Sequence, residues 1–128
     1  MSLKEWIKES NNIVFFGGAG VSTESNIPDF RSDNGLYKKQ YPYPAEVMLS
    51  HSFYESNPKE FFEFYFNQMI YKDAKPNKAH LALAQLEKQG KTKAVITQNI
   101  DGLHQAAGSK TVYELHGSVL RNTCTGCQ

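Results

Sequence analysis

The chain has 128 residues, of which 40% are hydrophobic and 21% are charged, and its formal net charge is +1. This length suits one domain, and the absence of a basic block from the sequence argues against a nucleic acid or an anionic membrane as partner. No apolar stretch approaches the roughly 18 residues of a membrane span, and "MSLKEWIKES" is too polar for a signal-peptide core. We therefore expect a cytoplasmic protein.

The N-terminal part alternates between short regular elements and loop. Leu3, Trp6 and Ile7 give a short first helix one apolar stripe. The continuous apolar run "IVFF" at 13–16 is typical of a buried parallel strand, and the glycine-rich segment "GGAGVSTES" follows it directly. Residues 28–56 are rich in Pro, Tyr, Ser and Asp, which predicts loop with short helical turns.

Two longer helices are expected next. Asn57 as N-cap and Pro58 at the first position begin a helix. Phe and Tyr lie on nearly every face of this helix, so it should be covered on more than one side. Asn77 caps a second, amphipathic helix, and Gly90 is its expected stop.

The alternation of strands with helices predicts the fold class. "KAVIT" at 93–97 and "TVYELHG" at 111–117 are further buried strands in this interpretation. Strands that alternate with helices favour an α/β fold with a parallel sheet. In such sheets, ligands bind outside the carboxyl ends of the strands. The strand-end segments "GGAGVSTES", "TQNID" and "ELHG" should therefore meet at one rim.

The glycine segment alone does not show whether it binds a phosphate or only forms a turn. Gly17, Gly18 and Gly20 allow backbone N–H groups to approach a phosphate. The pattern is G-x-G-x-x-T, because Thr23 stands where a dinucleotide fingerprint has its third glycine. No acidic residue ends an identifiable strand about 20 residues further on, where a ribose-binding carboxylate is expected. A tight turn and a phosphate cradle fit these glycines equally well.

Two other polar features also have plain structural explanations. In "IPDFRSDNGLY", Asp29 can cap local amides while Phe30 packs inward. His116 follows an apolar strand, and a single histidine at a strand end is often a satisfied structural residue. The other histidines are assigned such structural roles: His51, His80 and His104.

Taken together and in order, these motifs resemble one family. "GAGVSTESNIPDFR", "TQNIDGLHQAAG", "ELHGS" and "CTGC" closely resemble the sirtuins, the NAD-dependent protein lysine deacylases, from about residue 9 to residue 128. The resemblance implies a partial Rossmann-like sheet with flanking helices, a helical insertion and the start of a zinc-ribbon module. Family members usually have Gly where this chain has Asn26, a residue that tolerates positive φ.

The resemblance also implies roles for individual residues. The glycine loop would contact NAD, Phe30 would shield the reactive sugar carbon from water, and Asp101 would hold the nicotinamide carboxamide. His116 would be the general base, suited by an imidazole pKa of about 6.5, and Asn99 would order the ribose and water beside it. The implied NAD-binding residues are Gly18, Ala19, Thr23, Phe30, Arg31, Gln98, Asn99, Ile100, Asp101 and His116.

Cys124 and Cys127 would be half of a structural zinc site, since a tetrahedral site takes four ligands. We expect 1–117 to form the N-terminal part of the NAD-binding domain, with about 32–76 as the insertion, and 118–128 to begin a truncated zinc-binding module. Sirtuin cores are roughly twice this length. We therefore expect these residues alone to be poorly stable and catalytically incompetent.

The function implied is NAD-dependent deacetylation of acetylated-lysine proteins. Sirtuins that prefer acidic acyl groups carry Tyr-x-x-Arg in the aromatic helix, whereas here Tyr65 is followed three places later by Gln68. We therefore expect acetyl to be preferred to succinyl. Two alternatives stay open: a module that binds NAD or ADP-ribose without turnover, and a redox protein based on "CTGC". The oligomeric state is not predicted.

Overall fold

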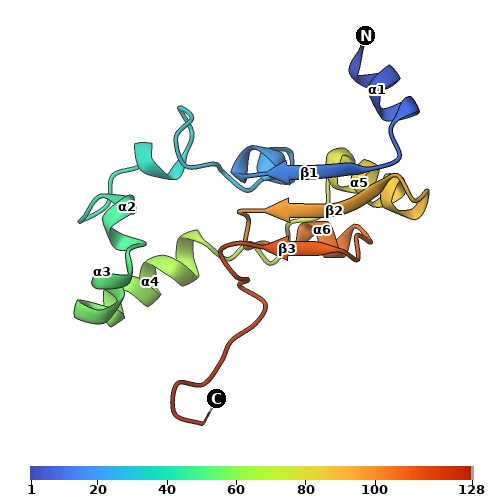
Figure 1. The fold of residues 1–128 in the computed structure, drawn as a ribbon. Coiled ribbons are helices and arrows are strands. Elements are labelled where there is room, and N and C mark those ends of the chain that lie inside the picture. The colour runs from blue at the N-terminus through green and yellow to red at the C-terminus, as the bar shows by residue number, and fades with distance from the viewer. Residues whose placement is uncertain (128) are drawn as a thin grey trace.

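The computed structural model describes residues 1–127 and shows a small parallel sheet joined to a helical extension (Figure 1). Its strands run side by side, helices lie behind them, and a group of short helices projects from the end at which the strand arrows point. The elements are α1 Leu3–Glu9, β1 Ile13–Gly17, the 3₁₀ helices η1 Ala19–Ser25 and η2 Leu36–Lys38, α2 Ala45–Met48, α3 His51–Ser56, α4 Pro58–Gln68, α5 Lys78–Lys88, β2 Thr92–Thr97, α6 Leu103–Ala106 and β3 Val112–Glu114.

The sheet has the order β1-β2-β3 and all pairs are parallel, which confirms the α/β prediction. The register aligns Phe16 with Ile96 and Ile96 with Tyr113. Because the strands are parallel, their carboxyl ends lie at the same edge of the sheet. The third strand covers 112–114 only, so it is shorter than the apolar run at 111–117 predicts.

One face of the sheet is packed and the other is open. On the packed face, Val95 is fully buried, α5 contacts β2, and the Phe15 ring lies 5.9 Å from that of His104 on α6. On the opposite face, Val14 and Phe16 are 57% and 61% exposed. The prediction that 13–16 is buried throughout is therefore wrong for alternate residues, because side chains of a strand point to opposite faces in turn.

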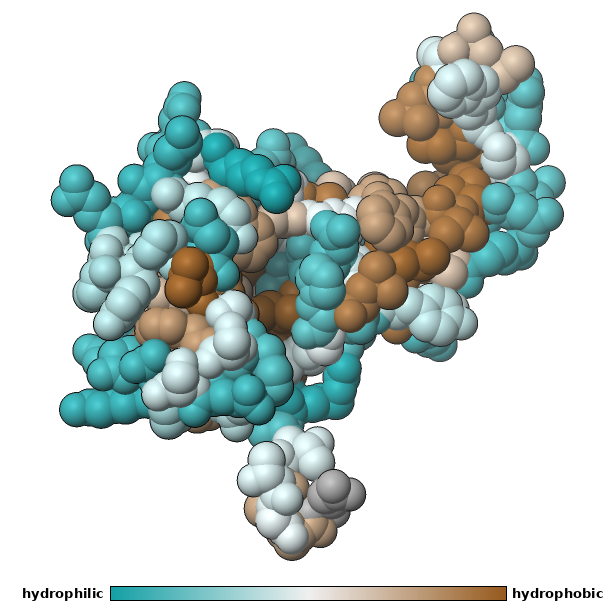
Figure 2. Space-filling view, turned by 60° about the vertical axis from the view of Figure 1, so that its left-hand side comes forward, coloured by the Kyte–Doolittle hydropathy of each residue, from teal (hydrophilic) through white to brown (hydrophobic). Residues whose placement is uncertain are grey.

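We call this open surface the bare face. It consists of Val14, Phe16, Ala94, Ile96 and Tyr113, which the register and the alternation of side chains place on one side of the sheet. Tyr113 is 59% exposed, whereas Ala94 and Ile96 of the central strand are half-buried. Figure 2 shows hydrophobic residues gathered in a band that runs from the centre of the molecule towards the N-terminal arm.

The helical extension has its own small core. Ala45, Met48, Phe53 and Phe64 are buried together, and the Tyr41 ring packs edge-on against Phe64 at 4.9 Å. The extension thus corresponds to the helical insertion in the sequence interpretation.

The aromatic helix α4 is less covered than its sequence predicts. Phe64 is its buried residue, whereas Phe62 and Phe66 are 42% and 62% exposed. Its aromatic side chains instead pack along the helix, with the rings of Phe62 and Phe66 stacked at 5.9 Å. The expectation of cover on several sides is therefore wrong in this structure.

The helix ends largely follow the sequence signals. Asn77 caps α5, with its side-chain oxygen accepting from the N–H of Ala79, and Gly90 adopts φ 76° at the end of that helix. Pro58 begins α4 as expected, but the Asn57 side chain makes no capping bond to the helix. Asn26 has φ 62°, the left-handed conformation that asparagine tolerates. Within residues 1–127, none of the helices is long and apolar enough to cross a bilayer.

Candidate functional site

The segments that follow β1, β2 and β3 meet at one cavity of about 910 Å³. Its other walls come from the loop before η2 and from α4 with the chain that follows it. The cavity therefore lies where a parallel sheet ordinarily binds its ligand. Eight of the sequence-predicted site residues line it: Ala19, Phe30, Arg31, Gln98, Asn99, Ile100, Asp101 and His116.

Two predicted residues, Gly18 and Thr23, are not among those that line the cavity. Gly18 lies against the Gln98 side chain, since a Cβ built on it would come within 2.9 Å of the Gln98 Oε1 atom. A side chain at position 18 would therefore push Gln98 from its place. The Thr23 hydroxyl donates to the carbonyl of Gly20 at 2.9 Å, so it stabilises the turn of η1. Both residues shape the loop without lining the cavity.

A buried hydrogen-bond network holds the inner side of the site. The Ser22 hydroxyl donates to Asp101 Oδ2 at 2.6 Å and accepts from the Asn99 side-chain N–H at 3.1 Å. Asp101 Oδ1 accepts from the N–H of Leu103 at 2.9 Å. A carboxylate can accept about four hydrogen bonds, so Asp101 keeps acceptor capacity towards the cavity.

Ser22 is a site residue that the sequence interpretation missed. It is 1% exposed and joins η1 after β1 to the segment after β2. It lies within the motif "GAGVS", but serine in a glycine-rich turn has many local partners. The contact that gives it importance spans 79 positions of the sequence, and neither periodicity nor spacing indicates such a contact.

The outer side of the site contains His116 and Gln98, both of which are exposed. His116 Nδ1 lies 3.0 Å from the backbone carbonyl oxygen of Gln98. A carbonyl oxygen only accepts hydrogen bonds, so this contact requires the proton to be on Nδ1. In neutral imidazole the lone pair is then on Nε2. The imidazole is thus oriented with a proton acceptor available.

The loop containing Phe30 and Arg31 is closed by its own hydrogen bonds. Asp29 Oδ1 accepts from the N–H and the hydroxyl of Ser32, at 3.1 and 2.5 Å. The Phe30 ring is half-buried and packs 5.4 Å from that of Tyr37. Asp29 thus caps a local amide and Phe30 packs against its neighbour, as the sequence suggests. The same loop also lines the cavity.

Uncharged side chains dominate the wall formed by α4. Phe61, Tyr65 and Gln68 line the cavity there, and burial raises the pKa of the Tyr65 hydroxyl. Gln68 Oε1 accepts a hydrogen bond of 3.0 Å from the Tyr41 hydroxyl. The cations that line the cavity, Arg31 and Lys72, lie outside this helix. The α4 wall is therefore suited to an uncharged group.

A pair of buried histidines lies beneath the packed face of the sheet. The rings of His80 on α5 and His104 on α6 meet edge-on at 4.7 Å, and both are at most 1% exposed. His80 Nδ1 accepts from the N–H of Asn77 at 3.1 Å. Within residues 1–127, His80 Nε2 and both ring nitrogens of His104 have no hydrogen-bond partner.

The prediction of satisfied structural histidines is therefore wrong for these atoms. Burial lowers the pKa of His80, and burial together with His80 lowers that of His104, although the Asp101 carboxylate opposes both shifts. Burial thus favours the neutral form of both rings. His51 differs, because it is exposed and lies 3.3 Å from Glu55.

The cysteines lie apart from this site. Cys124 and Cys127 are both exposed and free, and neither lines the cavity. Backbone hydrogen bonds from Cys127 and Gly126 lower the pKa of the Cys124 thiol. Over residues 1–127, no three His, Cys, Asp or Glu residues are grouped closely enough to bind a metal ion. The zinc site thus stays a prediction.

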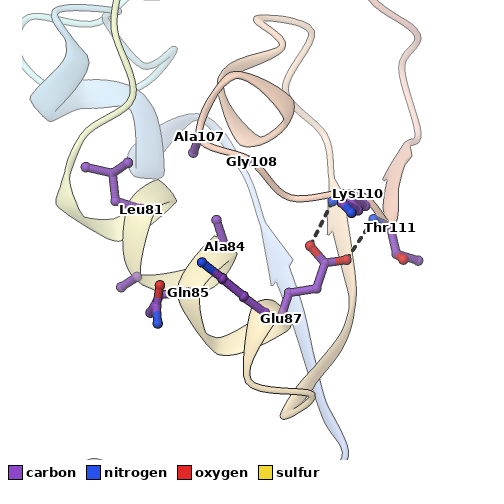
Figure 3. A pocket seen from close by; sticks show the side chains of 10 residues that line it. Leu81, Ala84, Gln85, Glu87, Ala107, Gly108, Lys110 and Thr111 are labelled. Carbon is purple, nitrogen blue, oxygen red and sulfur yellow. Dashed lines mark hydrogen bonds between the residues drawn. The ribbon is translucent and has the colours of Figure 1, made fainter.

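A second hollow, of about 970 Å³, lies between α5 and the chain that leads from α6 to β3 (Figure 3). Glu87 reaches across it and accepts from the N–H groups of Lys110 and Thr111, at 2.7 and 2.8 Å. Its lining contains no residue of the rim. We attribute to Glu87 the structural role of holding the start of β3 against α5.

Comparison with known proteins extends these observations. Residues 18–128 match the Sir2 family. A Clostridium acetobutylicum protein named NAD-dependent protein deacetylase is 67% identical over 127 residues, which cover 98% of this chain and 52% of that protein. A protein of the same name from Sulfolobus acidocaldarius is 51% identical, covering 96% of this chain and 48% of its own length.

Solved structures agree with this assignment. A Sir2 structure with a p53 peptide and NAD⁺ has a TM-score of 0.80 at 46% identity and covers 100% of this chain and 51% of that one. A Sir2 variant with a deacetylated p53 peptide and 3′-O-acetyl ADP-ribose reaches 0.86 at 47% identity, covering 99% and 52%. The sheet is therefore a partial Rossmann-like sheet, and this chain spans about half the length of the curated relatives. The chain belongs to the Sir2 family.

Proposed function

We propose that the rim cavity binds NAD and that the protein acts in NAD-dependent deacetylation of protein lysines, in which acetyl passes to ADP-ribose and nicotinamide is released. The observation that carries this proposal is the presence of Asp101 and His116 in one cavity at the ends of parallel strands. The names of the relatives and the NAD⁺ complex of a structural neighbour support it.

Each side of the cavity has a role in this proposal. Asp101, fixed by Ser22 and Leu103, accepts from the amide N–H₂ of nicotinamide and orients the leaving group. Ile100 contacts the same carboxamide, and Asn99 and Gln98 hold the ribose. Arg31 and Ala19 line the part of the cavity assigned to the cofactor, Gly18 and Thr23 shape the loop that contacts it, and Phe30 restricts water at the reactive carbon.

His116 is the proposed general base. Its Nδ1 is bound to the Gln98 carbonyl at 3.0 Å, which leaves Nε2 free to take a proton from a ribose hydroxyl. This assignment requires a neutral ring. The exposure of His116 allows a substrate to reach it from the open side of the cavity.

The proposed substrates are acetylated lysines of proteins. The α4 wall presents Phe61, Tyr65 and the amide of Gln68, whose oxygen is occupied by Tyr41. Such a wall suits a neutral acyl group, since an acidic one would need a cation beside it. On matched peptides, deacetylation should exceed desuccinylation, and the reverse ratio would contradict this preference. A cytoplasmic location stays a prediction from the sequence.

Zinc is proposed as a structural ion only. Cys124 and Cys127 lie in one turn, and the backbone hydrogen bonds that lower the pKa of Cys124 favour its thiolate, the form that binds metal. These two residues fit half of a four-ligand tetrahedral site. Zinc would stiffen the turn, and it takes no part in the steps assigned to Asp101 and His116.

The proposal is tested by measuring nicotinamide release from NAD in the presence of an acetyl-lysine peptide. The assay uses this chain and a chimera in which it replaces the matched half of the Clostridium acetobutylicum relative. We expect turnover in the chimera and its loss in the His116→Ala chimera. Normal turnover in that variant would overturn the role of His116. Saturable NAD binding without turnover in either protein would favour the alternative function of an NAD-binding module.

A further inference from the structure

The two sides of the helix α4 face different surroundings. Its inner side lines the rim cavity through Phe61, Tyr65 and Gln68. Because successive residues of an α-helix are about 100° apart, Phe62 and Phe66 point away from the cavity, and they are 42% and 62% exposed. We call this side the outer face of α4. It consists of four exposed residues: Lys59, Phe62, Glu63 and Phe66.

The aromatic rings on the outer face continue into a stripe that reaches α3. The Phe62 and Phe66 rings stack with their centres 5.9 Å apart, and the Tyr54 ring of α3 meets that of Phe62 edge-on at 5.9 Å. Contiguous exposed apolar surface marks interaction sites more often than scattered apolar residues do. Aromatic side chains are also enriched at protein–protein interfaces. The stripe therefore indicates a protein partner.

The charges beside the stripe indicate which protein this is. Lys59 and Glu63 lie one helical turn apart, so they flank Phe62 on the outer face. A lysine in the first turn opposes the helix dipole, and lysine before glutamate is the less favourable order for a pair within one helix. Over residues 1–127, neither side chain takes part in an ion pair. Both charges are therefore available to a partner.

A second copy of the chain complements this arrangement. When two outer faces pack antiparallel about a two-fold axis, Lys59 of each copy meets Glu63 of the other, so the ion pair forms twice. The Phe62 rings of both copies then lie near the axis, between the two ion pairs. Parallel packing would instead place like charges opposite one another. The outer face is thus self-complementary in charge when the helices are antiparallel.

We propose that the outer face of α4 is the contact surface of a homodimer in which the two α4 helices pack antiparallel. The aromatic stripe forms the centre of this interface, and two Lys59–Glu63 ion pairs flank it. The inner side of α4 stays at the rim cavity, so each copy keeps its own cavity. This inference goes beyond the proposed function and does not depend on turnover of NAD.

The test is analytical ultracentrifugation of the 128-residue chain and of the chimera with the Clostridium acetobutylicum relative. We expect a concentration-dependent equilibrium between monomer and dimer for both proteins. Phe66→Asp should weaken dimerisation about tenfold or more, because it replaces an apolar contact with a charge that the interface would bury.

The matched control in the free chain is Phe16→Asp. Phe16 is 61% exposed, close to the 62% of Phe66, but it lies on the bare face of the sheet. Neither substitution removes a buried side chain, so circular dichroism and thermal unfolding should match the wild type. The control variant should dimerise as the wild type does.

Charge reversal tests the antiparallel geometry. Lys59→Glu and Glu63→Lys each place like charges opposite one another twice, so each variant alone should dimerise about fivefold more weakly or worse. An equimolar mixture of the two variants should form a heterodimer with nearly wild-type affinity, because both ion pairs return with their signs exchanged. Both positions are exposed, and an acidic side chain suits the first turn of a helix, so the fold should be unchanged.

Three results would overturn the inference directly. They are a wild-type chain that stays monomeric at about 1 mM, equal weakening by Phe66→Asp and Phe16→Asp, and a mixture of the charge variants that does not associate. A dimeric chain with a monomeric chimera would show that the remainder of a Sir2 core covers this face, and it would also overturn the inference. His116→Ala separates the inference from the proposed function, because this variant should dimerise normally whether or not NAD is turned over.

Discussion

Val95 and Val14 are the same residue type on neighbouring strands of one sheet, yet Val95 is fully buried and Val14 is 57% exposed. The packed face, by contrast with the bare face, lies over two histidines, His80 and His104, whose rings are buried almost completely. The polarity of a side chain therefore does not determine its burial here. Burial is set by which face has a helical layer packed against it.

This contrast predicts different costs for the same truncation. Val95→Ala removes buried methyl groups and leaves a cavity, so it should lower the free energy of unfolding by about 2 kcal/mol. Val14→Ala should change it by less than about 0.5 kcal/mol, as expected for a surface position. Chemical denaturation of both variants measures this difference. Equal losses would show that the bare face is covered in the free chain.

The packed face should also make stability depend on pH. Burial lowers the pKa of His80 and His104 in the folded state, whereas the unfolded chain titrates near the ordinary value of about 6.5. Below that pH the unfolded state takes up protons that the folded state does not. Stability should therefore be full above about pH 6.5 and fall on acidification, by at most about 1.4 kcal/mol per pH unit for each histidine.

His104→Leu separates this effect from general acid sensitivity. The variant keeps an apolar contact for Phe15 and removes one titrating ring. The free energy of unfolding should therefore fall less between pH 7 and pH 5.5 than in the wild type. Urea denaturation at a series of pH values gives the slope of unfolding free energy against pH for the wild type and for the variant. An unchanged slope would contradict the assignment of the acid-induced loss of stability to His80 and His104.

A smaller effect is expected where the covering layer meets the glycine loop. Asn77 caps α5, and its side-chain N–H group donates to the Val21 carbonyl and to the Ser25 hydroxyl, at 2.7 and 3.1 Å. Asn77→Ala should lower stability by about 1 kcal/mol. It should also weaken NAD binding, because η1 loses its anchor. Thermal unfolding and calorimetry test the two effects, and a stable variant with unchanged NAD affinity would contradict this linkage.

The local and periodic features of this structure were predictable from the sequence. The three parallel strands, the caps at Asn77 and Gly90, and the convergence of the strand ends follow from patterns within a few residues. The exposure of Val14 and Phe16 was not predictable, because an apolar run does not reveal whether a layer covers it. The Ser22–Asp101 bond and the His80–His104 contact join distant segments, so they depend on tertiary packing.

The central claim is that the rim binds NAD with Asp101 at the nicotinamide, and calorimetric titration with NAD and with ADP-ribose tests it most directly. ADP-ribose lacks nicotinamide, so Asp101→Asn should weaken binding of NAD about tenfold, through loss of a charged hydrogen-bond acceptor. The affinity for ADP-ribose should stay within about twofold of the wild type, because ADP-ribose has no carboxamide for the side chain of residue 101 to hold. Failure of the wild-type chain to bind either ligand, or an equal loss of both in Asp101→Asn, would contradict the account.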